Sequence, residues 1–276
     1  MYDVSSVSIV SGLLLCMLLT MEVGFRSGRR KQAIATEAIT QANAVLASML
    51  GLLALLLAFT FSAALQRYDE RSQAVVAEAN AIGTAYLRTQ LLPGRMHDEV
   101  QELLRQYLDV RVEESRVSTA DTVKRESLLQ RADLMAARLW SQAVRAAEQD
   151  GRSITSGLFV QSINGLIDAY GIRNASLNRH VPEIVLFLMF ATIVMTTATL
   201  GYASGIAGHR VTLAAFVLVV LIALVVFLIV DLDRPRRGII QVSHDSLLNL
   251  QQTIRTAQGD HAQPGSPPHA SPAPRR

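Results

Sequence analysis

Long apolar runs dominate the pattern of this chain, and four of them are long enough to cross a lipid bilayer. A spanning helix needs about 20 mainly apolar residues, because backbone amides buried in lipid must be paired within the segment. The second and fourth runs contain no charge, whereas the first is diluted by Ser8, Ser11 and Thr20. The predicted spans cover, approximately, residues 7–23, 44–65, 184–202 and 211–230.

The first run is weak enough to be compared with a cleaved signal peptide. A signal peptide begins with a basic segment, but this chain has Asp3 there. The small residues of a lipoprotein cleavage site are missing before Cys16. We therefore interpret the run as a span and Cys16, which has no second cysteine to pair with, as a membrane-buried thiol.

A polar segment, residues 67–181, separates the second and third spans and shows helical periodicity throughout. Two of its apolar stripes contain Val75, Ala79, Ile82 and Tyr86, and Val100, Leu103, Leu104, Tyr107 and Leu108. Pro93-Gly94 predicts a break between two helices, and a third helix is expected after the capping residues 118–121. A fourth is expected from Ser153. Because only Gly83 interrupts residues 65–92, the first of these helices can continue the second span.

These patterns predict an all-α membrane protein with a helical extramembrane domain inserted between spans two and three. Spans one and two occupy residues 1–66, the domain 67–181, and spans three and four 182–231. Residues 232–257 are expected to form a juxtamembrane turn and a short amphipathic helix, capped by Ser243, with Leu247, Leu248, Leu250 and Ile254 on its apolar face. Residues 258–276, rich in histidine, proline and serine, are predicted to be a disordered tail.

Composition and charge narrow the possible functions. Half of the residues are hydrophobic and only 18% are charged, which is too apolar for an ordinary soluble domain. The net charge is +3, yet residues 67–181 carry fifteen basic and fifteen acidic side chains. Nucleic-acid binding needs a basic face on the polar domain, so we do not expect a nucleic-acid partner.

The sequence shows no spacing typical of a catalytic, cofactor or metal site. Its six histidines are scattered and have no cysteine partner, so neither an enzyme nor a zinc site is predicted. Gly201 and Gly205 are spaced for close helix contact, but their position between spans three and four favours a turn. Threonines on span three either line a polar path or bond back to their own helix. An interfacial salt-bridged turn is predicted after span four, comprising Asp231, Asp233, Arg234, Arg236 and Arg237.

Several ordered motifs resemble one family of bacterial membrane proteins. They are FTFS at 59–62, RYDER at 67–71, EANAIGTAYLR at 78–88, GLFVQSIN at 157–164 and IVDLDRPRRG at 229–238. Together they resemble the DUF4239 family, which is described as bestrophin-like and whose own function is not established. Bestrophins are pentameric ion channels with four spans per subunit and a pore lined by the second span.

The resemblance implies a homo-oligomer, a pentamer by analogy, that passes small inorganic ions. Its candidate pore-lining residues are Leu55, Phe59, Phe61 and Ser62, where packing between helices is the alternative. Bestrophin necks stack apolar side chains at four-residue steps, but here that step reaches Leu55, Phe59 and Ala63 and leaves Phe61 off the face. The Asp231-Leu232-Asp233 segment is a poor match for the bestrophin calcium site, so we predict none.

The charges alone leave the orientation of the chain in the membrane nearly undecided. The cluster from Arg26 to Lys31 favours a cytoplasmic first loop, whereas Arg67, Arg71 and others near span ends favour a cytoplasmic location for the opposite side, which holds the polar segment. The resemblance places the helical domain and both termini in the cytoplasm, with the chain in the lipid bilayer of a bacterial inner membrane. The alternative function is a membrane-anchored scaffold whose helical domain binds a partner. An enzyme or a transporter would need convergent or mid-membrane polar groups that are not visible.

Overall fold

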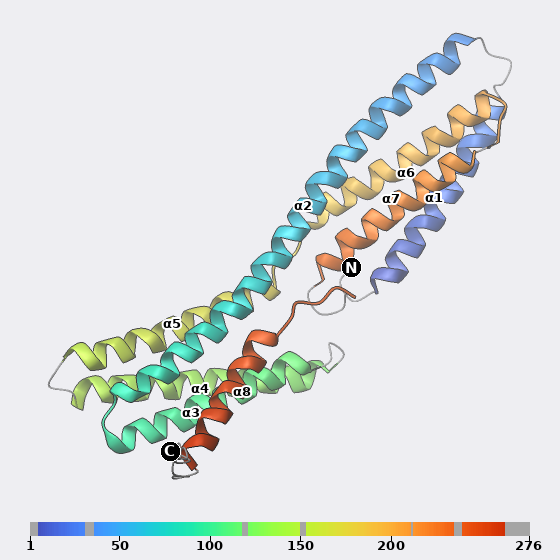
Figure 1. Cartoon of the computed structure of the whole chain (residues 1–276). Helices are drawn as coiled ribbons and strands as arrows, with labels where there is room; N and C mark the ends of the chain where they lie inside the picture. The colour runs from blue at the N-terminus through green and yellow to red at the C-terminus, as the bar shows by residue number, and fades with distance from the viewer. Residues whose placement is uncertain are drawn as a thin grey trace, which may run out of the picture. The chain divides into compact units, whose positions relative to one another are not determined.

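The computed structural model describes residues 5–30, 36–117, 121–149, 153–210, 212–234 and 239–262. Within these ranges every regular element is helical (Figure 1). The elements are α1 (Ser6–Arg29), α2 (Thr36–Arg88), the short 3₁₀ helix η1 (Thr89–Leu91), α3 (Gly94–Arg116), α4 (Thr122–Gln149), α5 (Ser153–Leu177), α6 (Glu183–Ile206), α7 (Leu213–Leu232) and α8 (Asp245–Ala262).

Four of these helices, α1, α2, α6 and α7, are long and apolar enough to cross a membrane. This result confirms the predicted fold class, an all-α membrane protein with four spanning helices. The 53-residue α2 runs without interruption from the second apolar run to Arg88. The predicted continuation of the second span as one rod is therefore confirmed.

The chain divides into two compact units. Unit 1 comprises Met1–Ser72 and Asn174–Val242, and unit 2 comprises Gln73–Arg173 and Ser243–Arg276. Unit 1 contains α1, α6, α7 and the first part of α2, whereas unit 2 contains α3, α4, α8, the remainder of α2 and most of α5. The C-terminal helix therefore belongs with the polar helices rather than with the spans.

In unit 1, α1 and α6 are in backbone contact along a line of glycines. A Cβ atom added to Gly24 would lie 2.1 Å from the carbonyl oxygen of Ala198, and one added to Gly201 would lie 2.0 Å from that of Met21. Gly28 and Gly205 repeat this contact one turn later. The prediction of a turn at Gly201 and Gly205 is therefore wrong, because both residues lie inside α6 and let its axis approach α1.

The threonines of α6 serve the helix itself. Thr192, Thr196, Thr197 and Thr199 each donate a hydrogen bond to the carbonyl oxygen four residues earlier. Thr197 also lies 3.1 Å from the hydroxyl of Thr20 on α1. Of the two interpretations offered for these residues, the structure supports back-bonding, which satisfies a hydroxyl that lipid could not hydrate.

Unit 2 is a bundle whose breaks follow the local signals in the sequence. The chain turns at Pro93, and Gly94 begins α3 with a φ of +31°, a conformation that glycine adopts without strain. The Asp121 carboxylate accepts the amide of Lys124 at the start of α4, while the other predicted cap residues, 118–120, lie outside the described ranges. α5 starts at Ser153, as predicted.

α8 completes unit 2 through its apolar face. Leu247 and Ile254 are buried, and Leu250 packs over Gly83 of α2. Ser243 accepts the amide of Asp245 at the start of the helix, and Asp109 of α3 accepts hydrogen bonds from Gln251 and Arg255. α8 continues to Ala262, past the boundary predicted at residue 257, and the rest of the predicted tail lies outside the described residues.

Candidate pore face and buried charges

The candidate pore residues lie on two different faces of α2. Leu55 and Phe59 are 53% and 66% exposed, and Ser62 is exposed beside them. Phe61 is half-buried and packs against the core of unit 1. In an α-helix, side chains two positions apart point about 200° away from each other around the axis. Phe59 and Phe61 therefore point in nearly opposite directions. The structure thus groups Leu55, Phe59 and Ser62 and separates Phe61 from them.

The span of α2 is the least covered of the four. In its most apolar stretch of 18 residues only 11% are buried within the chain, compared with 33% in α6 and in α7. Phe59, at 66% exposure, is therefore left mostly uncovered by its own chain. Lipid, another copy of the chain or a water-filled space must meet this side of α2.

The end of α7 is a buried polar junction. The Asp231 carboxylate accepts the amides of Ile239 and Ile240 at 3.1 and 2.9 Å, and that of Asp233 accepts the amide of Val181 at 2.9 Å. Both carboxylates are buried, as is Arg234. In the described part, the two aspartates therefore bind backbone amides. Arg236 and Arg237, the other members of the predicted turn, lie outside the described residues.

Arg71 of α2 also belongs to this junction. Its guanidinium is 1% exposed and donates to the carbonyl oxygens of Leu232, Asp233 and Arg179 at 2.9, 3.1 and 3.3 Å. The first two carbonyls end α7, where the unpaired carbonyls of a helix concentrate negative potential. One side chain of α2 is thereby bonded to the end of α7 and to the segment before α6.

Unit 2 contains a cluster of four buried charges, Glu78 of α2, Arg111 and Glu114 of α3, and Arg173 of α5. The Glu78 carboxylate accepts from Arg111 Nε at 2.6 Å and from Arg173 Nη1. Glu114 Oε2 lies 3.6 Å from both guanidinium groups. Two positive and two negative side chains therefore cancel, which is what allows them to be buried.

Two tyrosines complete this buried-charge cluster. The Arg111 guanidinium lies 4.7 Å from the centroid of the Tyr170 ring, and the Tyr170 hydroxyl donates to Asp133 at 2.6 Å. Burial lowers the pKa of Arg111, but the interactions with Glu78, Tyr107 and Glu114 together outweigh it, so the pKa lies above its ordinary value. Burial, reinforced by Glu78, raises the pKa of the Tyr107 phenol.

Sequence reasoning missed the buried-charge cluster and the junction at Arg71. A signal for the cluster was present, since Glu78 falls three residues after Val75, next to Ala79 in a predicted apolar stripe. A charge at such a position indicates a buried partner rather than a solvated face. The partner's identity depends on α3 and α5, which are 33 and 95 residues away along the chain.

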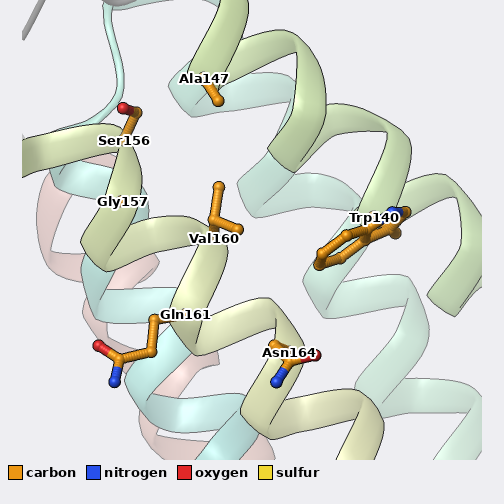
Figure 2. A pocket seen from close by; sticks show the side chains of 7 residues that line it. All are labelled: Trp140, Ala147, Ser156, Gly157, Val160, Gln161 and Asn164. Carbon is orange, nitrogen blue, oxygen red and sulfur yellow. The ribbon is translucent and has the colours of Figure 1, made fainter. Parts of the chain in front are cut away.

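A surface groove of about 520 Å³ runs between α4 and α5 (Figure 2). Trp140 extends from α4 toward Val160 and Asn164 of α5, and Gly157 leaves room beside them. The groove contains amide, hydroxyl and apolar groups but no titratable side chain. Among the residues that the structure describes, no three His, Cys, Asp or Glu side chains converge where a metal could bind.

Comparison with known proteins gives a family and a fold. The family model described as "Bestrophin-like domain" matches residues 9–247. No curated protein matches the chain. A crystal structure of a variant of a bacterial bestrophin homologue from Klebsiella pneumoniae superimposes with a TM-score of 0.70 at 15% identity, covering 93% of this chain and 99% of that one. A second variant gives 0.65 at 14% identity, covering 91% and 99%. At such identity the likeness shows a shared fold.

Proposed function

We propose that this chain, which belongs to the bestrophin-like domain family, assembles into a homo-oligomeric ion channel whose pore is lined by α2. The observation that carries this proposal is the exposed stripe of Leu55, Phe59 and Ser62 on the span with the least intrachain cover. Apolar rings at a constriction gate ion passage by excluding water. We assign Phe59 to the narrow point and withdraw Phe61 from the pore, because it packs into the core of its own subunit.

A single copy has too few spans to enclose a pore, so the proposal requires several copies. We propose five, by analogy with bestrophins, arranged with α2 nearest the axis. Small inorganic ions are the expected substrate, since the α2 stripe offers no charged group to hold a larger solute.

Location and orientation follow from the same analogy. We place the spans in a bacterial inner membrane and unit 2, with both termini, in the cytoplasm. The balanced charge and buried ion cluster of unit 2 suit a water-facing bundle. We further propose that, within the bestrophin-like proteins, the chain is a member of the DUF4239 family.

The second candidate function is a membrane-anchored scaffold, which the α4–α5 groove favours. Trp140 is 41% exposed there, and an exposed tryptophan beside polar groups is typical of a protein interface. Under this view a partner occupies the groove, and α2 faces lipid.

The first experiment measures the mass of the purified chain in mild detergent by light scattering, corrected for bound detergent. A subunit is 30.1 kDa, and a discrete mass of five subunits supports the channel. A monomer would contradict it and favour the scaffold.

Ion flux into liposomes then tests Phe59. Phe59→Ala should change the flux of the oligomer, because it removes the apolar constriction. Phe187→Ala is the matched control, since Phe187 of α6 is 69% exposed and lies outside the proposed pore stripe. Equal flux in both variants and the parent would contradict the assignment of Phe59.

A further inference from the structure

In unit 1, α2 meets the other spans through one narrow stripe. Its most buried side chains there are Leu53, Thr60, Ala64 and Arg71. These positions follow one another at intervals of seven, four and seven residues, so they lie along one line of the helix. The contacts along this line determine the rotation of α2 about its own axis. That rotation determines which way Phe59 points.

The polar contacts of α2 that precede Arg71 along the helix restrict its rotation only weakly. Thr60 donates to Met189 Sδ at 3.6 Å, and Thr199 donates to Met49 Sδ at 3.5 Å, which are long contacts to a weak acceptor. Apolar burial is non-directional, so it restricts the rotation of α2 less than directional hydrogen bonds do.

Arg71 is different because its contacts are directional and come from two segments. Its two terminal nitrogens reach three carbonyl oxygens, those of Leu232 and Asp233 at the end of α7 and that of Arg179 before α6. A planar guanidinium that bonds to three acceptors from two segments restricts the rotation of the helix that bears it. Asp233 in turn holds the amide of Val181, which fixes the second segment to the first.

We propose that Arg71 is the positioning residue of the pore helix, the group that sets the rotation of α2 so that Phe59 faces away from the core and Phe61 into it. This inference rests on the proposed channel function. Phe59 lies 12 residues before Arg71, about 18 Å along a continuous helix. A helix is stiff enough over that distance to transmit the setting.

Thiol accessibility in the full-length channel tests the inference. In a Cys16→Ala background the introduced thiol is the only one. Single cysteines at Phe59 and Phe61, in liposomes, are treated with an anionic, membrane-impermeant methanethiosulfonate. With Arg71 present, position 59 should react at least about tenfold faster than position 61. This ratio corresponds to a free-energy preference of about 1.4 kcal/mol for the rotation of α2 that exposes position 59.

Arg71→Met should bring the two rates within a factor of about three of each other, since a loss of about 0.7 kcal/mol of preference is enough. Arg67→Met is the matched control, because Arg67 lies one turn earlier and donates to Ala63 of its own helix. It should leave the ratio unchanged. An unchanged ratio in Arg71→Met, at the parent's oligomeric mass, would overturn the inference.

Two further variants separate the possible failures. If Arg71→Met does not assemble, Arg71→Lys keeps the cation without the fork and should give an intermediate ratio; a parental ratio would overturn the role of the fork. Leu221→Cys on α7, which is exposed and lies outside the proposed pore stripe, reports the unreactive baseline. Reaction at position 59 no faster than this baseline, with Arg71 present, would refute the pore assignment and this inference with it.

Discussion

The two units solve the same packing problem with opposite chemistry. In unit 1, α1 and α6 are held by the absence of side chains at four glycines, and backbone meets backbone. In unit 2, α2, α3 and α5 are held by two arginines and two glutamates, all buried. Helices in lipid gain little from burying apolar surface, so close contact must come from small residues. A bundle in water gains that surface energy and can include a balanced ion cluster.

The largest loss of stability is expected from a substitution of Glu78 in unit 2. Glu78→Gln leaves Arg111 and Arg173 buried with only Glu114, which lies at 3.6 Å. Breaking a buried pair in this way costs about 3–5 kcal/mol. Hydrogen exchange should show the loss as reduced protection of α3 and α5.

The matched control is Glu102→Gln, whose exposed pair with Arg105 contributes at most about 1 kcal/mol. Parental protection in Glu78→Gln would show that the cluster does not stabilise unit 2.

A smaller but still large effect is expected at Gly201. Gly201→Ala places a Cβ 2.0 Å from the Met21 carbonyl oxygen, so α6 must move away from α1, at a cost of about 1–3 kcal/mol. Thermal unfolding in detergent should show the loss in the spans.

Gly12→Ala is the control on α1, because its Cβ meets nothing, and alanine there should stabilise the helix by about 0.5–1 kcal/mol. If both variants lowered the melting temperature equally, glycine packing would not be what joins α1 and α6.

The smallest effect is expected at Tyr107, which is fully buried in unit 2 with a hydroxyl that finds no partner among the described residues. Tyr107→Phe removes this unpaired group and should stabilise unit 2 by about 1 kcal/mol. Because burial raises the pKa of the phenol, the folded state resists the ionisation that the unfolded chain undergoes above about pH 10.

Stability of unit 2 should therefore fall as the pH rises past about 10, and Tyr107→Phe should weaken that fall. Chemical denaturation at pH 8 and pH 11 measures both effects. An identical decline in the parent and the variant would exclude Tyr107 as its source.

Local sequence patterns were sufficient to predict features that depend on a single helix, such as where it begins, ends or continues. The apolar runs located the four spans, Pro93 and Gly94 located a break, and the lack of breakers before residue 88 predicted the continuous α2. The glycines of α6 show where this reasoning ends. Their spacing was visible, but whether they form a turn or a contact depended on Gly24 and Gly28, which lie more than a hundred residues away.

The proposed pore stripe shows the same division within one helix. The four-residue step in the sequence already left Phe61 off the face of Leu55 and Phe59. That Phe61 packs against the core of unit 1 was visible only in the structure.

The apolar runs alone predict a four-span helical membrane protein, because a segment in lipid must pair its own backbone amides and therefore forms a long apolar helix. Three contacts became visible only in the folded chain: α1 and α6 touch through glycines, Glu78 is neutralised by arginines from two other helices, and Arg71 joins α2 to the end of α7. These are pairings between residues far apart in the chain. Periodicity within one segment reports which face is buried and cannot report which partner buries it.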